Sequence, residues 1–331
     1  MPQFREHRIA AQNVKSLCWH DHYLVDWVGG GNIYHLDGSI QERHVNYAYR
    51  FDAAIVSPSG DFACIYERLG TKGLLLDHGK ILREINRSFY QAHVYEYPVT
   101  FIQLADGREL LAHCPEEYRR IDIEDARTGE RLTSSTTREP QDMFHSCLAC
   151  SPSGRWLLSA GWVWAPWDVV ALYDIPQALS DPTLLDKYGV APETSAEVYA
   201  AAFSDADTVV LLTSEETNDD DDPLGRAGPH SIAYYDLLTR EYRSIAQAEE
   251  VVGKLMPVGQ DYIVGFYEYP KLFDSATGKV LHRWPDLPTG TQTGSIQWHI
   301  DSVPPVAIDL ANKRFAVAGA DAITVIEIVA D

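Results

Sequence analysis

The chain has 331 residues, of which 45% are hydrophobic and 23% charged, an ordinary balance for a protein that buries a core. No stretch approaches the roughly 20 apolar residues that span a bilayer, so we expect no membrane partner. Forty-eight acidic residues against 27 basic ones give a formal net charge of −21, which argues against nucleic acid as a partner because phosphate binding requires Lys and Arg. An acidic field favours solubility and would attract a basic protein.

The cysteines indicate a reducing compartment. Five cysteines are an odd number for a disulfide framework and favour free thiols in the cytoplasm: Cys18, Cys64, Cys114, Cys147 and Cys150. Cys147 and Cys150 have CxxC spacing, but no second pair or histidine stands at the distance that a zinc finger requires. The pair falls in a predicted inner strand, where side chains three residues apart point to opposite sides. We therefore expect two buried structural cysteines and no metal.

A short hairpin motif recurs along the chain. The clearest copies, in which a polar turn separates two apolar runs, are 55–65, 102–111 and 148–158. Their turn glycines, Gly60, Gly107 and Gly154, follow one another at steps of 47 residues. Less regular copies with the same alternation are 19–23, 203–208, 256–261 and 310–314. Self-similarity at a fixed spacing predicts a repeat architecture.

A second element follows each hairpin and contains an acidic residue before a turn. In 123–132 and 272–281 it ends in a Thr-Gly turn, and 234–242 is a third copy. A carboxylate at this position can accept hydrogen bonds from the N–H groups of the turn, so it needs no catalytic explanation. The hairpin and this element together make four short strands per copy.

Seven copies in 331 residues give about 47 residues per copy, near the ~40–45 residues of a WD repeat. In this period, and in the hydrophobic-Asp-x-x-Thr-Gly pattern of the third strand, the chain resembles the WD-repeat β-propeller family over nearly its whole length. It lacks the Gly-His start and the Trp-Asp end of that family. The resemblance implies an all-β fold, a single closed β-propeller with seven four-stranded blades. Six or eight blades stay open as alternatives, because residues 180–197 are difficult to assign.

The N-terminal segment is expected to close the ring. The last copy contains strands at 306–309, 315–318 and 323–328, but no fourth strand follows them. Residues 4–10 precede the first copy and are similar to the fourth strands of other copies. Pairing them with the last blade would remove an open sheet edge. We therefore predict one propeller domain over 1–331, in which strand 4–10 completes the C-terminal blade 304–331.

A ring of four-stranded blades has two unequal faces. The turns between first and second and between third and fourth strands lie on one face, here called the turn side, which we expect to carry tight turns throughout. All other connections lie on the opposite face, here called the loop-rich side. It is expected to collect the long segments 88–97, 161–168, 180–197, 215–230 and 285–295. Long loops on a rigid scaffold often carry binding sites, and exposed Trp and Tyr are common interface anchors.

Aromatic and acidic side chains of these loops are the candidate partner-binding residues: Tyr47, Tyr49, Tyr90, Tyr95, Tyr97, Trp162, Trp164, Trp167, Asp219, Asp220, Asp221 and Asp222. They predict a non-catalytic cytoplasmic scaffold that binds a protein and needs no cofactor. A narrower version is an inhibitor or immunity-type protein that blocks a basic partner. The aspartate run lacks the alternating spacing of a calcium loop and indicates a solvated loop, with an electrostatic contact or a weak cation site left open.

An enzyme is the alternative hypothesis. Carboxylates and histidines at the start of inner strands can converge on the central channel of a propeller. The candidates come from different predicted blades: Asp52, His145, His299 and Asp301. Such a set would suit a metal-dependent hydrolase or lactonase.

Overall fold

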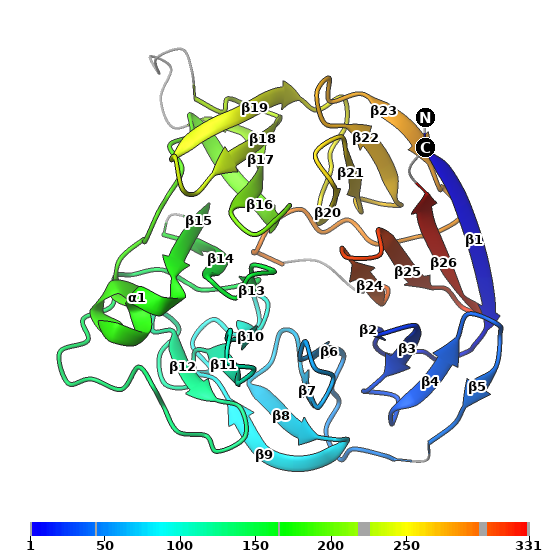
Figure 1. Ribbon diagram of the computed structural model, residues 1–331, viewed down its shortest axis with the longest axis horizontal. Coiled ribbons are helices and arrows are strands. Elements are labelled where there is room, and N and C mark those ends of the chain that lie inside the picture. The colour runs from blue at the N-terminus through cyan, green and yellow to red at the C-terminus, as the bar shows by residue number, and fades with distance from the viewer. Residues whose placement is uncertain (1, 44, 165, 218–225, 298–302, 330–331) are drawn as a thin grey trace.

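The computed structural model describes residues 2–43, 45–164, 166–217, 226–297 and 303–329. These residues form seven antiparallel sheets that surround a common axis as the blades of a propeller (Figure 1). The predicted all-β fold with seven blades is therefore confirmed, and the alternatives of six and eight are excluded. In the described part of the chain, no helix is long and apolar enough to cross a membrane.

Each blade runs from an innermost strand at the axis to an outer strand at the rim. Blade 1 contains β2 (Cys18–His20), β3 (Tyr23–Asp26), β4 (Asn32–His35) and β5 (Ile40–Gln41), and blade 2 contains β6 (Ala53–Val56), β7 (Phe62–Tyr66), β8 (Lys72–Asp77) and β9 (Lys80–Asn86). Blade 3 contains β10 (Val99–Gln103), β11 (Glu109–His113) and β12 (Asp122–Asp125), and blade 4 contains β13 (Ala149–Cys150), β14 (Trp156–Val163) and β15 (Trp167–Asp174). Blade 5 contains β16 (Ala196–Phe203), β17 (Thr208–Thr217), β18 (Ser231–Asp236) and β19 (Glu241–Gln247). Blade 6 contains β20 (Leu255–Val258), β21 (Tyr262–Gly265), β22 (Lys271–Asp274) and β23 (Val280–Arg283). Blade 7 contains β24 (Val306–Asp309), β25 (Arg314–Ala318), β26 (Ala322–Val329) and, from the N-terminus, β1 (Gln3–Ala10).

Blades 3 and 4 have a reduced fourth strand. Single antiparallel bridges, Glu124 to Arg131 and Leu172 to Val190, occupy the outer position in these two sheets. The four-strand plan is kept in all seven blades, but the outermost pairing is shortest in these two.

The seam predicted for the ring is confirmed. Strand β1 pairs antiparallel with β26 in a register that runs from Gln3 opposite Val329 to Ala10 opposite Ala322 (Figure 1). Ile9 of β1 is fully buried and packs with Ile323 and with residues of blade 1. The N-terminal strand therefore covers the edge of β26 and contributes to the core beside it.

The turns have the geometry that the repeat predicts. Gly60, Gly107 and Gly154 have φ angles of 79°, 85° and 72°, in the left-handed region that suits glycine. In the Thr-Gly turns, Asp125 accepts a hydrogen bond from Thr128 N at 2.7 Å, and Asp274 accepts one from Thr277 N at 2.8 Å. The repeated carboxylates thus cap turns, as expected.

The hydrophobic core lies mostly between neighbouring blades. Leu158 and Leu172 of blade 4, for example, pack with Val209 and Leu211 of blade 5, and all four are fully buried. Each sheet therefore buries both of its faces against other sheets, which is why a single blade of this sequence could not be stable alone.

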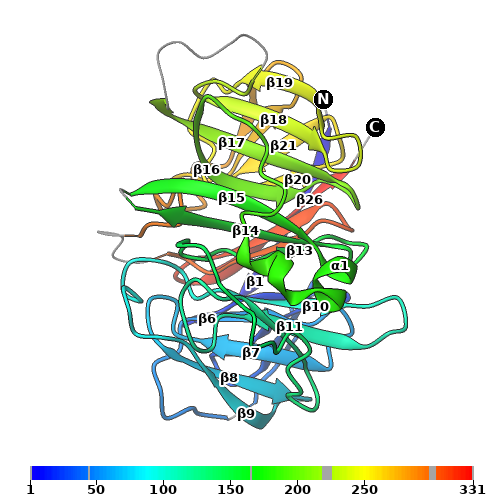
Figure 2. The ribbon, with the colours of Figure 1, turned by 90° about the vertical axis from the view of Figure 1, so that its left-hand side faces the viewer.

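The turn side is not uniformly smooth, which corrects the prediction for 180–197. The short helix α1 (Ile175–Ser180) and the 3-10 turn η1 (Pro182–Asp186) replace the tight turn between the third and fourth strands of blade 4 (Figures 1 and 2). Asp174 caps α1 by accepting a hydrogen bond from Gln177 N, and a proline occupies the first turn. Only the end of 180–197, after the bridge at Val190, continues to the loop-rich side.

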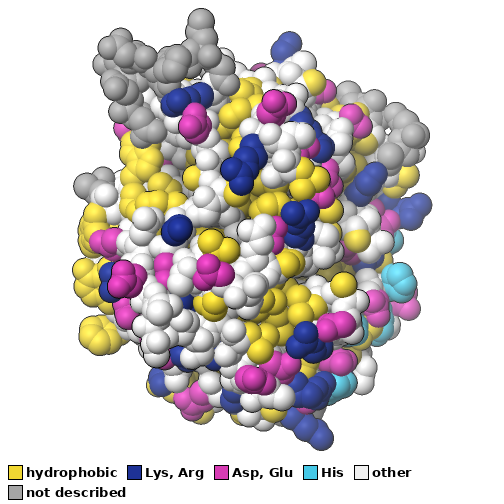
Figure 3. All heavy atoms as spheres, turned by 60° about the vertical axis from the view of Figure 1, so that its left-hand side comes forward, with side chains coloured by type: hydrophobic (Ala, Val, Ile, Leu, Met, Phe, Trp, Pro, Cys, Tyr) yellow, Lys and Arg dark blue, Asp and Glu magenta, His cyan; other side chains and the backbone are white. Residues whose placement is uncertain are grey.

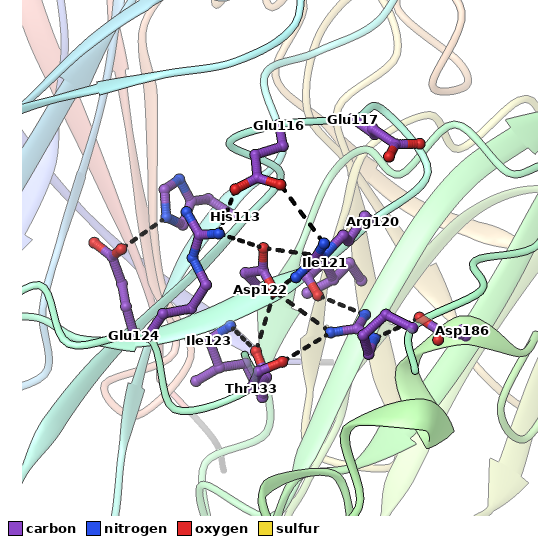
Figure 4. A network of polar contacts seen from close by, with 12 residues as sticks. His113, Glu116, Glu117, Arg120, Ile121, Asp122, Ile123, Glu124, Thr133 and Asp186 are labelled. Carbon is purple, nitrogen blue, oxygen red and sulfur yellow. Dashed lines mark hydrogen bonds and ion pairs between the residues drawn. The ribbon is translucent and has the colours of Figure 1, made fainter. Parts of the chain in front are cut away.

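A buried ionic network holds this insertion against blade 3 (Figure 4). The Arg138 guanidinium donates to Asp186 Oδ1 at 2.6 Å and lies 3.4 Å from Asp122 Oδ1. It also donates to the carbonyl groups of Ile121 and Thr133 at 3.0 and 3.2 Å. Each of the three guanidinium nitrogen atoms of this buried cation donates at least one hydrogen bond, so the network can stabilise the junction in spite of its desolvation cost.

Candidate functional site

A stack of three aromatic rings lies between blades 3 and 4 on the loop-rich side. Phe144 is sandwiched by Trp162, at a centroid distance of 3.9 Å and an interplanar angle of 8°, and by Tyr118, at 4.1 Å and 20°. The rings come from three separate segments: the second-to-third-strand loop of blade 3, the connection to blade 4, and β14. An antiparallel bridge between Phe144 and Trp162 fixes their spacing. We call these three residues the aromatic column.

Exposed aromatic side chains surround the column. Phe89 is 85% exposed, Trp164 50% and Tyr90 42%; we call these three the aromatic apex. Trp164 meets Trp162 edge-on at 4.9 Å, and Tyr90 lies 5.1 Å from the ring of Tyr118. Two of the three apex rings therefore rest on a buried support. Hydrophobic side chains also protrude along the left-hand edge of Figure 3, which is the loop-rich side.

The structure divides the predicted partner-binding residues into three groups. Exposed rings are Tyr49, Tyr90 and Trp164, whereas Tyr47 and Trp167 are half-buried. Tyr95, Tyr97 and Trp162 are buried, which corrects their prediction as surface anchors. Tyr95 and Trp162 pack against Phe144, and the hydroxyl of Tyr97 donates to the Ile85 carbonyl at 2.9 Å. Asp219, Asp220, Asp221 and Asp222 lie outside the described residues.

Tyr118 and Phe144 were not predicted as part of the site. Tyr118 lies in a connection with no unusual composition, and Phe144 is a single aromatic residue before a short strand. Only the tertiary fold brings both to Trp162, so no spacing in the sequence signals them.

An acidic group borders the column. The hydroxyl of Tyr118 donates to Asp142 Oδ1 at 2.6 Å, and burial together with this carboxylate raises the pKa of Tyr118. Asp142 is exposed and has no ion pair within the described chain. Glu117 also lies nearby in sequence but is paired with Arg119 at 2.9 Å. The carboxylate of Asp142 accepts from Tyr118 through Oδ1 but has no cationic partner within the described chain, so a cationic group that approaches the apex can contact it.

The central channel contains a cavity of about 470 Å³ that is lined by residues in or beside the inner strands of all seven blades. Glu96 lies 4.0 Å from Arg68 and accepts a hydrogen bond from the Tyr66 hydroxyl at 3.4 Å. Burial favours a raised pKa for Glu96, but Arg68 and Lys254 outweigh it and lower that pKa. Asp52 accepts a hydrogen bond from Arg68 N at 2.7 Å, and burial raises its pKa.

The described enzyme candidates do not converge. Asp52 lines the channel, but His145 is buried away from it, which corrects the prediction that it faces the axis. Its Nε2 donates to the Arg119 carbonyl at 3.1 Å and its Nδ1 accepts from the Ser159 hydroxyl at 3.0 Å. Burial lowers the pKa of His145 to about 4. His299 and Asp301 lie outside the described residues, and the described part of the chain holds no group of three metal-ligating side chains.

The two CxxC cysteines also line the channel. Cys147 and Cys150 are free thiols and only half-buried, so the expectation of two fully buried cysteines is corrected. Strand β13 contains only Ala149 and Cys150, and Cys147 has a φ of 44° just before it. The alternation of an ideal strand therefore does not extend over both thiols.

Residues 284–297, here called the crossing segment, run from blade 6 over the loop-rich end of the channel (Figure 1). Gln297 N donates to the Val94 carbonyl at 2.7 Å, and Ile296 forms a bridge with Tyr95. The Ser295 hydroxyl donates to the carboxylate of Asp168. These contacts attach a connection of blade 6 to blades 3 and 4 on the other side of the axis.

The Asp168 carboxyl is held in unusual surroundings. Burial raises its pKa to about 7, and the charge of Glu197 contributes to the rise. Glu197 accepts a hydrogen bond from Asp168 N at 2.8 Å and another from the Ser214 hydroxyl at 2.9 Å. The result is a pair of neighbouring carboxyl groups beneath the crossing segment, in which Asp168 carries a proton over part of the neutral range.

Comparison with known proteins adds no family to this description. No protein-family model matches the sequence, and no curated protein matches it. The resemblance to WD-repeat proteins is therefore supported at the level of the seven-bladed architecture, and no WD-repeat membership or subfamily follows from it.

Proposed function

We propose that the protein is a binding scaffold whose protein partner docks on the aromatic apex of the loop-rich side. The observation that carries the proposal is the exposure of Phe89, Tyr90 and Trp164 beside a buried aromatic column. Large rings held by rigid support lose little conformational entropy on binding, and Trp and Tyr are frequent hot spots of protein interfaces. A β-propeller that presents loops from a fixed frame is compatible with this role.

The charge of the molecule favours a basic partner. The chain carries a net charge of −21, and Asp142 offers an unpaired carboxylate within the described chain beside the column. A Lys or Arg side chain of a partner could contact this carboxylate and lie over an exposed ring. An inhibitor or immunity-type protein that covers the active surface of a basic enzyme would use such a site, and long-range attraction would speed its association.

Recovery of the partner from the native host, followed by affinity measurements with purified proteins, tests the proposal. We expect Trp164→Ala and Tyr90→Ala each to weaken binding about tenfold or more, as for interface anchors. Leu238→Ala is the matched control, because Leu238 is 56% exposed and follows β18 on the turn side. Unchanged affinity of both apex variants, or loss of binding in the control, would place the partner elsewhere.

A further inference from the structure

The channel has a different charge balance from the molecule as a whole. The chain carries a net charge of −21, yet the charged residues that line the cavity of about 470 Å³ are three basic and two acidic: Lys15, Arg68, Lys254, Asp52 and Glu96. In so acidic a chain, an excess of basic groups at the axis is a local feature that composition does not explain.

The two carboxylates of the channel already have partners. Arg68 faces Glu96 at 4.0 Å and donates its backbone N–H to Asp52. The side chain of Lys254, in contrast, makes no hydrogen bond or ion pair within the described part of the chain, although its charge helps to lower the pKa of Glu96. A cationic group is therefore available to a ligand inside the channel.

Lys254 is placed at the junction of two cavities. It directly precedes β20 and lines both the larger cavity and a second one of about 490 Å³. The second cavity lies toward the turn side, between Trp19, Pro58 and Pro152. The charge of Lys254 acts on other blades across the axis: burial raises the pKa of Cys147, and Lys254 opposes that rise.

Small and aliphatic side chains of the inner strands form part of the wall of the larger cavity. They include Ala54 of blade 2, Ala149 of blade 4, Ala201 of blade 5 and Ile308 of blade 7. Small residues leave the axis open, and Lys254 is exposed, so its ammonium group is accessible to an anion that enters the channel. A total of several hundred Å³ is also the usual size of a small-molecule site.

We propose that the channel binds a small organic carboxylate, with its anionic group on Lys254 Nζ and a short apolar body along the alanine-lined wall. The ligand enters from the turn side, because the crossing segment contributes Gln292, Thr293 and Gly294 at the opposite end. This site is separate from the aromatic apex, so the loss of either one leaves the other intact.

Thermal unfolding of the full chain tests the proposal with sodium acetate, butyrate and hexanoate as probes, each against sodium chloride at equal ionic strength. We expect butyrate and hexanoate to raise the midpoint by about 2 °C or more at saturation, and acetate to raise it less. The shift should vanish in Lys254→Met and persist in Lys279→Met, an exposed lysine of the same blade. Equal shifts in Lys254→Met, or none in the natural chain, would overturn the proposal.

Thiol modification tests the same proposal on the natural chain, so it does not require that a Lys254 variant folds. Cys147 and Cys150 line the same cavity, so their rates with an anionic and a cationic methanethiosulfonate reagent report the local potential. After each rate is divided by the rate of the same reagent with free cysteine, we expect the anionic reagent to react about fivefold faster, and hexanoate to slow both reagents. Peptide mass spectrometry assigns the modified thiol. Equal rates, or no protection by hexanoate, would contradict an anion site here.

Discussion

A buried histidine makes stability depend on pH in a direction that the structure fixes. His145 has a pKa of about 4 in the folded chain because burial disfavours its charged form, whereas an unfolded histidine has a pKa near 6.5. Between these values the unfolded state binds the extra proton. The contribution of His145 is therefore complete above about pH 6.5 and is lost as the pH falls toward 4. The neutral ring is held by Arg119 and Ser159 on its two nitrogen atoms.

We expect the free energy of unfolding of the natural chain to fall by about 3 kcal/mol between pH 6.5 and 4 through this group alone. His145→Gln removes the titration and can still donate to the Arg119 carbonyl, so the variant should lose less stability over that range, although it is less stable at pH 7. Urea unfolding at several pH values measures both. His22→Gln, an exposed control, should keep the slope of the natural chain. An identical slope in His145→Gln would show that the fold does not lower the pKa of His145.

The position of His145 could not be predicted from the sequence. The residues before β13 were expected to continue an inner strand, which would have turned His145 toward the axis. The strand contains only Ala149 and Cys150, and the positive φ of Cys147 interrupts the backbone between them and His145. Hairpin period, turn glycines and capping aspartates could be predicted because each depends on residues a few positions apart. The stack of Tyr118 on Phe144 could not be predicted, because it depends on contacts between segments that are far apart in the sequence.

Among the elements, the insertion of α1 and η1 is the part of blade 4 that the repeat does not predict. A helix of six residues is too short to show a helical period, so its only local signals are Asp174 and the following proline. Its attachment to blade 3 depends on Arg138, which is almost fully buried between Asp122 and Asp186. The insertion is thus held by a charge network in addition to apolar packing, since Ile175, Ala178 and Leu185 are buried in one cluster with side chains of blade 3.

We expect Arg138→Met to destabilise the protein by about 3–5 kcal/mol, because two buried carboxylates then lose their shared cation. Urea unfolding against Arg8→Met, an exposed arginine of β1, separates this effect from the loss of a surface charge, which should cost less than about 0.5 kcal/mol. A cost below about 1 kcal/mol would contradict the assigned role of Arg138 and mean that Arg120 and Arg131, which lie 3.3 and 3.6 Å from Asp122 Oδ2, suffice to compensate this carboxylate. Methionine keeps most of the side-chain volume, so a large loss cannot be assigned to a cavity.

At the scale of the whole molecule, the two ends of the channel have different surroundings. The loop-rich end is crossed by residues 284–297 and bordered by the aromatic apex, whereas the cavity lined by Lys254 extends toward the turn side. A protein partner on one face and a small ligand from the other would therefore not compete for the same atoms. The seven-bladed ring would separate the two proposed sites while it holds both on one frame.

That frame depends on the seam between β1 and β26, which joins the two ends of the chain through eight paired residues on each strand. Removal of residues 2–11 would expose the edge of β26 and take Ile9 out of the core beside Ile323. We expect the truncated chain to unfold at a clearly lower urea concentration and to associate through the free edge, since an unpaired strand is a template for pairing. A synthetic peptide of residues 2–11 should bind the truncated chain and restore the midpoint, while a peptide with Ile9→Asp should not. If the truncated chain unfolds like the natural one, apolar packing between blades closes the ring without the seam.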